Sequence, residues 1–520
     1  MHAVGTPLKQ AGAKLVLGPC EQPRQGGLAH PQHGSGVGDL PVVREAEQTA
    51  EILNLHPAII RSPHVRDQIH AFEVYSWALH SDLVTPAAGR AAPAIPALPP
   101  AAGECYRPGD PGYRRITVAL FAAGVATFAL LYSTQALLPV LARAFSLSAA
   151  RSTLSVSLAT VGLGAALLVT GPVSEVLGRT RLIHISLMAS SVLELACALA
   201  PSWDVLLTLR LAQGVTLAGL PAVATAYLRE EIHSRTYARA AGQYIGGTVL
   251  GGLAGRLVTS TVADAAGWRW ALAAIAALGL ACAVIVFFVL PPSRNFTPAP
   301  MGPGKLMATT RRAVSDPGLL ALYAIGACSM GAFVAVFNTI GFRLTSAPFH
   351  FSAGAVGLVF LIYPVGSLSA ALAGRMADRF SRRAVVPASC LVSAAGLLLT
   401  LPGSPPAIVL GLAMMLAGFF GMHGVASGWV PVRAHAGGIP PGQAASLYLF
   451  AYYLGSSVFG SLAGPAWTLG AWPAVAALAL ALLAASGLLT AWLRHIPSLL
   501  QTGPERGAHE RAIWRRRDPG

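Results

Sequence analysis

Charged side chains are scarce in this chain of 520 residues. They make up 11% of it, whereas a soluble domain carries about 25%. Lysine is almost absent, since Lys9, Lys14 and Lys305 are the only three. Apolar residues account for 54% of the chain, and 55 positions are glycine. This composition excludes an ordinary soluble domain and indicates a protein that crosses a membrane many times.

Cysteine is sparse too, and the motifs of common catalytic sites are missing. None of the six cysteines has a partner at metal-ligand spacing. The glycine-rich stretches lack the Gly-Lys-Ser/Thr ending of a phosphate-binding loop, which argues against a process driven by ATP. No Ser-His-acid set has a soluble scaffold to align it. We therefore expect neither an enzyme nor a bound metal or cofactor.

The formal net charge of +15 comes almost wholly from arginine. Nucleic-acid binding is one interpretation of so basic a chain. The arginines, however, lie in short loops between apolar runs, where positive charge sets membrane orientation. They gather after the second, fourth, eighth and tenth runs and in the middle linker, while the loops 201–204 and 402–406 hold no base. We expect both termini and the linker in the cytoplasm, and no nucleic-acid partner.

Apolar runs of roughly 20 residues, each long enough to cross a bilayer, follow one another from about residue 114. We predict transmembrane helices at 116–138, 153–171, 182–200, 205–228, 239–259, 270–290, 319–341, 353–374, 385–401, 407–430, 443–464 and 472–493. Residues 113–290 would form one six-helix bundle and 318–496 a second. A cytoplasmic linker at 291–317 would join them, and 497–520 would be a basic tail.

Residues 1–112 differ from the rest of the chain. They are rich in proline, glycine and histidine, hold no run long enough to span a bilayer, and lack the pattern of a signal peptide. Three interpretations compete: a disordered cytoplasmic tail, a translation start assigned too early with the true start near Tyr113, and a small regulatory segment. The sequence does not separate them.

A polar loop motif occurs twice and relates the two bundles. It reads GPVSEVLGRTR at 171–181 and GRMADRFSRR at 374–383, so that Gly374 follows Gly171 by 203 positions. The stretch 239–245 (RAAGQYI) likewise lines up with 443–449 (QAASLYL), at an offset of 204. Trp268 and Trp472 share that offset. The membrane part is therefore one unit used twice, which predicts an all-α fold of twelve transmembrane helices in two pseudo-symmetric six-helix bundles.

Twelve spans in two repeats, with this motif in both, resemble the major facilitator superfamily over about residues 113–496. The stretch 210–214 (RLAQG) resembles the fourth-span arginine motif of its proton-driven antiporters, and 246–252 (GGTVLGG) a degraded form of their fifth-span motif, without its proline. The stretches 418–424 and 452–457 look most like the bacterial sugar or drug efflux branch. The resemblance implies two bundles that rock about a midplane cavity.

The two loop motifs are the predicted gate. Their glycines would let helices approach closely, and each carboxylate would accept hydrogen bonds from a helix N-terminus of the opposite bundle. The resemblance implies that the partner of Glu175 is the eleventh span, near Gln443; a solvated turn with anchoring arginines is the alternative. The gating residues are Gly171, Glu175, Gly178, Arg179, Arg181, Gly374, Asp378, Arg379, Arg382 and Arg383.

Ionisable residues inside the spans are costly in hydrocarbon and are therefore functional candidates. Glu194 and Arg210 would lie about 9–10 Å deep on adjacent antiparallel helices, which predicts an ion pair. That pair would either couple proton and substrate binding or serve packing alone. Arg256 is expected to extend to the outer interface. His423 would be a core histidine, a proton carrier or a hydrogen-bonding partner of a sugar.

Uncharged polar residues complete the predicted cavity. Tyr448 and Tyr452, one helical turn apart, would share a face of the eleventh span, and tyrosine suits a sugar or an amphipathic compound. Membrane-interface anchoring is the alternative for each tyrosine. The remaining members are Tyr132, Gln135, Gln213 and Asn338.

These observations predict a secondary transporter in a bacterial inner membrane. It would act as a monomer and export a small amphipathic compound or a sugar in exchange for protons. The same fold working as a proton-linked uptake system or a facilitated-diffusion carrier is the closest alternative. A membrane sensor that does not transport is the alternative from another class.

Overall fold

The structure is a computed structural model that describes residues 105–298 and 302–496. The tail at 497–520 and most of the leader therefore lie outside the described residues. Within those ranges every regular element is a helix, apart from one β-bridge between Tyr106 and Ile232. The described residues belong to one compact unit.

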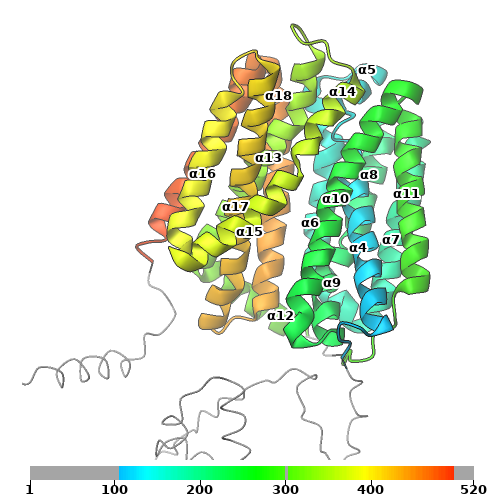
Figure 1. Ribbon diagram of the computed structural model, residues 1–520, viewed down its shortest axis with the longest axis vertical. Helices are drawn as coiled ribbons and strands as arrows, with labels where there is room; N and C mark the ends of the chain where they lie inside the picture. The colour runs from blue at the N-terminus through cyan, green and yellow to red at the C-terminus, as the bar shows by residue number, and fades with distance from the viewer. Residues whose placement is uncertain (1–104, 299–301, 497–520) are drawn as a thin grey trace, which may run out of the picture. The chain divides into compact units, whose positions relative to one another are not determined.

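The first six-helix bundle begins two residues before its predicted start. Figure 1 shows its helices. The helices α8 and α9 form one span from Trp203 to Glu231, and α5 is a short element after the first span. The elements are α4 (Pro111–Tyr132), α5 (Leu138–Ala144), α6 (Ala149–Leu177), α7 (Arg179–Ala198), α8 (Trp203–Leu217), α9 (Gly219–Glu231), α10 (Ser234–Ala266) and α11 (Trp268–Val289).

The second bundle repeats this plan after a linker that contains a helix of its own, α12 (Pro303–Ser315), which the sequence analysis did not predict. The helices α14 and α15, with the short 3-10 turn η1 between them, form one span from Ala353 to Arg379. The elements are α13 (Pro317–Thr345), α14 (Ala353–Leu358), η1 (Val359–Ile362), α15 (Pro364–Arg379), α16 (Arg382–Leu399), α17 (Pro405–Ala436) and α18 (Pro441–Trp492).

The course of the chain gives the twelve predicted spans. Within the described residues, ten segments are long and apolar enough to cross a membrane. One of them, α18, contains non-helical backbone at Gly470 and Ala471, so it supplies two spans. The glycine-rich α10, with three arginines and one aspartate, is the remaining span. It runs well beyond the predicted 239–259 at both ends.

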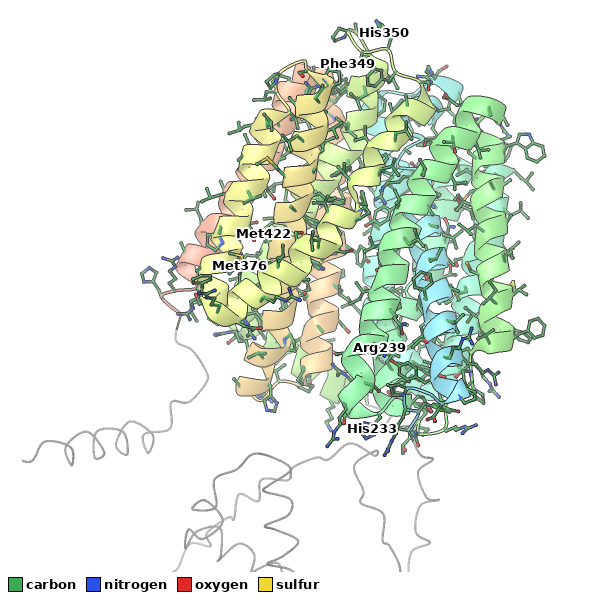
Figure 2. The ribbon with its side chains drawn as sticks, in the orientation of Figure 1. His233, Arg239, Phe349, His350, Met376 and Met422 are labelled. Carbon is green, nitrogen blue, oxygen red and sulfur yellow. The ribbon has the colours of Figure 1, made fainter. Side chains whose placement is uncertain are left out.

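The helices have two distinct ends. The motif end carries the α6–α7 and α15–α16 turns, and the far end carries the α7–α8 and α10–α11 turns. Figure 2 shows His233 and Arg239 at the motif end, at the bottom of the view, and Phe349 and His350 at the opposite end.

Hydrogen bonds join the two bundles from mid-depth to the far end. The hydroxyls of Thr160 on α6 and Ser457 on α18 lie 2.8 Å apart, and Ser457 also donates to the Ser157 carbonyl at 2.9 Å. At the far end of α10, the Asp264 carboxylate accepts from the amides of Ala353 and Gly354, which begin α14. The bundles are therefore fastened together at the far end.

Glycine residues allow the central helices to pack closely. Gly247, Gly251 and Gly255 recur every four residues on α10, and a Cβ on any of them would collide with the backbone of α4. The same joint recurs in the second bundle, where Gly455 of α18, at the offset of 204 from Gly251, packs on the Ala327 backbone of α13. The sequence duplication is thus also a duplication of helix packing.

Replacing Gly251 with alanine should lower the stability of the purified protein by about 1–3 kcal/mol, because the methyl group forces α4 away. Gly242, on the same helix, has nothing within 4 Å of its would-be Cβ. Gly242→Ala should therefore be neutral or stabilising by up to about 1 kcal/mol, through helix propensity. Thermal melts in detergent compare the two variants, and equal melting temperatures would contradict the packing argument.

Candidate functional site

The predicted ion pair between Glu194 and Arg210 is present in the core of the first bundle. Arg210 Nη1 lies 3.4 Å from Glu194 Oε2, and both side chains are completely buried. Gln213, one turn after Arg210 on α8, connects them: its amide donates to Glu194 Oε2 at 2.6 Å, and its oxygen accepts from Arg210 Nη1 at 2.6 Å. Three of the predicted site residues therefore form one cluster.

Backbone carbonyls hold the guanidinium of Arg210 in place. It donates to the carbonyls of Leu130 and Leu131 at the end of α4 and to that of Ser155 on α6. The last carbonyls of α4 have no amide donor within the helix, so Arg210 caps this end of α4. Glu194 is less well satisfied, because its Oε1 is buried without a hydrogen-bond partner.

Arg256 does not extend to the outer interface, so that prediction was wrong. The helix α10 continues for ten residues beyond it, which places it about 15 Å from the far end, near the middle of a 30 Å hydrocarbon core. Its side chain is 1% exposed. Its Nε donates to Gln135 Oε1 at 2.6 Å, and its Nη1 donates to the Gly252 carbonyl of its own helix.

Gln135 links Arg256 to the second bundle. The Gln135 amide donates to Asn338 Oδ1 on α13 at 2.7 Å, and the Asn338 amide donates to the Gly460 carbonyl on α18 at 3.4 Å. Both side chains are buried. The structure therefore brings together two predicted site residues from different bundles and joins them to an arginine that the sequence analysis had placed elsewhere.

Aromatic rings enclose the Arg256 guanidinium. Its carbon lies 4.2 Å from the centre of the Tyr132 ring, 4.6 Å from that of Tyr363 and 5.4 Å from that of Phe360. Tyr132 comes from the first bundle, and the other two come from the second. Such rings attract a cation through their electron-rich faces.

The aromatic cluster continues into the second bundle to His423 on α17. His423 Nδ1 lies 2.9 Å from the Tyr448 hydroxyl, and its ring is stacked on that of Phe419 and tilted against that of Tyr452, at 5.9 and 4.6 Å between centroids. Tyr448 and Tyr452 share a helix face as predicted. His423 and Tyr452 are half-buried.

The first loop motif forms an ion network within its own bundle. Arg179 pairs with Glu175 at 2.7 Å and with Glu230 at the end of α9 at 3.0 Å, and it donates to the Ser174 hydroxyl. Gly178 is required by the turn itself, since its φ of 82° disfavours any other residue. The contact between Glu175 and the eleventh span stays a prediction. Arg181 is exposed.

The opening glycines of the two motifs do not lie at a close approach here, contrary to expectation. A Cβ on Gly171 or on Gly374 would meet no atom within 4 Å. Helix packing that excludes larger side chains lies elsewhere, for example on α10 and α18.

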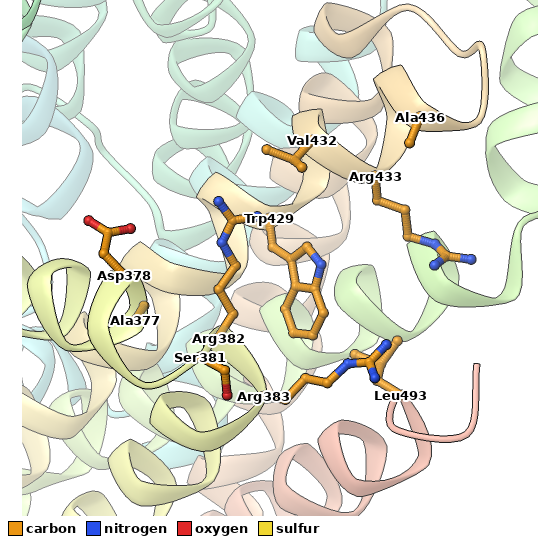
Figure 3. Close-up of a pocket in the computed structure, with 10 residues that line it drawn as sticks. All are labelled: Ala377, Asp378, Ser381, Arg382, Arg383, Trp429, Val432, Arg433, Ala436 and Leu493. Atoms are coloured by element: carbon orange, nitrogen blue, oxygen red, sulfur yellow. The ribbon is translucent and has the colours of Figure 1, made fainter. Parts of the chain in front are cut away.

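The second loop motif lines a pocket of about 470 Å³ at the motif end. In Figure 3 the Trp429 indole lies between Asp378 on one side and Arg433 on the other, with Arg382 and Arg383 beside it. Asp378 and Arg379 are exposed. The pocket walls therefore carry arginines of α16 and α17 together with one carboxylate.

Asp316, just before α13, anchors Arg433 of this pocket. Its carboxylate accepts from Arg433 Nε at 2.6 Å and from Nη2 at 2.9 Å, and it caps α13 through the Leu319 amide. Burial raises the pKa of Asp316, but these hydrogen bonds outweigh it and hold the pKa below its ordinary value.

Sequence reasoning missed the aromatic members of the site. They come from α13, η1, the turn after η1 and α17 of the second bundle, where an aromatic residue in an apolar run gives no signal by itself. The spacing of Phe333 and Phe337, one turn apart on the predicted seventh span, could have indicated a shared face. The missed residues are Phe333, Phe337, Phe360, Tyr363 and Phe419.

The arrangement offers two chemically different centres. Glu194, Arg210 and Gln213 lie inside one bundle, around a buried carboxyl group. Arg256, Gln135 and Asn338 lie between the bundles, with a cation beside aromatic surface. Across 105–298 and 302–496, no group of three histidine, cysteine or acidic side chains is placed to hold a metal ion.

Comparisons with known proteins agree with this architecture. Residues 119–348 match the family model described as Major Facilitator Superfamily. The chain is 41% identical over 362 residues to the MFS-type transporter YybF of Bacillus subtilis, covering 70% of this chain and 89% of that protein. It is 42% identical over 369 residues to the inner membrane transport protein YnfM of Escherichia coli, covering 71% and 88%.

Among solved structures, a bacterial homologue of the human lysosomal transporter Spinster superposes with a TM-score of 0.58 at 15% identity, covering 74% of this chain and 95% of that one. At that identity the likeness shows the fold alone. Sequence relatives, helix order and repeat packing lead to the same conclusion. The chain is a membrane transport protein that belongs to the major facilitator superfamily.

Proposed function

We propose that this transporter exports a small organic compound in exchange for protons, by alternating access, with Glu194 as the proton carrier. The observation that carries the proposal is the state of the Glu194 carboxyl group. It is completely buried, it shares one oxygen with Arg210 and Gln213, and its other oxygen makes no hydrogen bond of ordinary geometry, although the Ser133 hydroxyl lies near the carboxyl group. A buried carboxylate oxygen without a partner is costly, and a proton removes that cost.

The far end is the closed end of the transport route in this conformation. Hydrogen bonds join the bundles there, while the motif glycines Gly171 and Gly374 stand in open space. We infer that in the alternate conformation the motif end closes and these glycines come to lie against the opposite bundle. The arginine-rich motif end is the cytoplasmic one, by the positive-inside rule.

Direction of transport is the part of the proposal that rests on resemblance. The stretch 210–214, which resembles the antiporter motif, supplies both Arg210 and Gln213 of the proton centre, which favours proton exchange over facilitated diffusion. Proton-linked uptake uses the same two centres and is the alternative. A panel of candidate compounds, scored as resistance and intracellular accumulation in cells lacking and overexpressing the protein, would supply the substrate for the assays below.

Replacing Glu194 with glutamine should abolish proton exchange, because an amide cannot take up and release a proton at this site. In vesicles with an inside-acid gradient reported by a dye, the substrate should dissipate the gradient through the wild-type protein and not through the variant. Asp204, exposed at the start of α8, provides the control, since Asp204→Asn should behave as wild type. A full gradient response from Glu194→Gln would rule this residue out as the carrier.

Replacing Arg210 with methionine should destabilise the purified protein by roughly 3–5 kcal/mol, because Glu194 and several carbonyls lose their donor in a buried place. The double variant Glu194→Gln/Arg210→Met should recover part of the loss, since no uncompensated carboxylate remains. Thermal melts of the three variants measure both effects. A loss below about 1 kcal/mol for the single variant, the size typical of an exposed pair, would contradict the role of Arg210 as a structural cation.

Two truncations test whether the leader is needed for transport. Tyr106 pairs with the α9–α10 turn through the Glu231 carbonyl at 2.9 Å and the His233 amide at 3.1 Å, and Arg294 lies over its ring. Deleting residues 2–104 should leave transport intact, whereas deleting 2–110 should lower thermal stability by removing these contacts. Loss of all function in the shorter deletion would instead favour the sensor alternative.

A further inference from the structure

Arg256 and Arg210 are both fully buried, yet their surroundings differ. Arg210 has a carboxylate partner and three backbone carbonyls. Arg256 has an amide oxygen and one carbonyl, and the described part of the chain gives it no carboxylate partner. Because a guanidinium keeps its charge under all ordinary conditions, Arg256 is a buried cation whose charge the protein leaves uncompensated.

The second repeat makes the corresponding contact without a cation. Gln135 and Asn338 lie 203 positions apart, the spacing of the two motif glycines, and they bond to each other across the two bundles. In the second repeat, Gly460 occupies the position that corresponds to Arg256 at the offset of 204. There the Asn338 amide is satisfied by the Gly460 carbonyl alone. In the second repeat, Asn338 therefore bonds to a backbone carbonyl, whereas in the first repeat Gln135 bonds to the charged side chain of Arg256.

The surroundings of Arg256 specify what could compensate its charge. Tyr132, Tyr363 and Phe360 present apolar ring faces to the guanidinium. These rings come from both bundles. A compound bound here would meet one cation and several aromatic surfaces at mid-depth of the membrane.

We propose that Arg256 is the anion-binding group of the transport site, and that the transported compound is a small organic monocarboxylate with an aromatic or alicyclic body. This inference rests on the proposed transport function and narrows its substrate class. A planar carboxylate matches the paired donors of a guanidinium. A phosphate carries more charge than one arginine compensates, and Arg210 is already paired.

Binding of a carboxylate would also reach the junction between the bundles. Arg256 donates a hydrogen bond to Gln135, and Gln135 donates one to Asn338 of the second bundle. An anion that competes for the guanidinium acts on the first member of this chain of hydrogen bonds. Substrate occupancy is thereby linked to the contact that must break or shift when the far end opens.

The test uses the full-length protein purified in detergent and measures binding without transport. Thermal shift and tryptophan fluorescence titrations would compare benzoate, phenylacetate and cyclohexanecarboxylate with their neutral amides. The acids should stabilise the protein and the amides should not. Since no proton gradient is involved, failure of proton exchange leaves this result unchanged, so the two proposals fail separately.

Substitution at position 256 locates the effect. Arg256→Gln should weaken carboxylate binding by about 30-fold or more, and Arg256→Lys should retain part of it. Arg239→Gln is the matched control, since Arg239 is exposed on the same helix at the motif end (Figure 2) and the variant has the same net charge. Should Arg256→Gln fail to fold, the carboxylate affinity of Arg256→Lys and the comparison of acids with amides still test whether Arg256 binds the anion.

Three results would overturn the inference. The first is equal stabilisation by acids and amides, which would mean that the anionic group is not recognised. The second is a carboxylate affinity of Arg256→Gln within a few-fold of wild type. The third is the absence of a shift with every carboxylate of the panel at millimolar concentration.

Discussion

A guanidinium group buried in a helical bundle is the constraint on which this structure depends. It cannot lose its proton, so each buried arginine must find acceptors or remain a local excess of positive charge. Arg210 is accommodated by carbonyls left over at the end of α4 and by Glu194. The position of that helix end, and hence of Tyr132 at the end and Gln135 just beyond it, follows from this arrangement.

The second arginine depends on the glycines of α10. Gly247, Gly251 and Gly255 bring α10 against the backbone of α4, and Arg256 follows the last of them. Its side chain therefore emerges beside Tyr132 and Gln135, at the junction of the two bundles, and not toward lipid. Close helix packing and the placement of the charge are thus one feature of the fold.

Much of this was readable from the sequence, because duplication and apolar length are strong signals. The twelve spans, the two bundles and the pair formed by Glu194 and Arg210 followed from periodicity and from equal depth on antiparallel helices. Arg256 did not, because its span was predicted to end at 259, whereas α10 continues to Ala266. A boundary error of seven residues corresponds to about 10 Å of depth, enough to exchange a mid-membrane position for an interfacial one. The aromatic residues around it come from three separate elements, and no local pattern brings them together.

The two centres also explain why the duplicated fold is not chemically symmetric. The repeats share helix packing, as the glycines Gly251 and Gly455 show, but the positions of Glu194, Arg210 and Arg256 have no charged counterparts at the repeat offset of 204, where Leu398, Met414 and Gly460 stand. The fully buried ionisable side chains of the two centres therefore lie in the first bundle, and the second supplies aromatic surface and His423. A rocking motion that is symmetric in packing would move the aromatic wall relative to a fixed set of charges. Such a difference between the bundles lets a bound compound interact differently with the two conformations, and a ligand can bias their equilibrium only through that differential interaction.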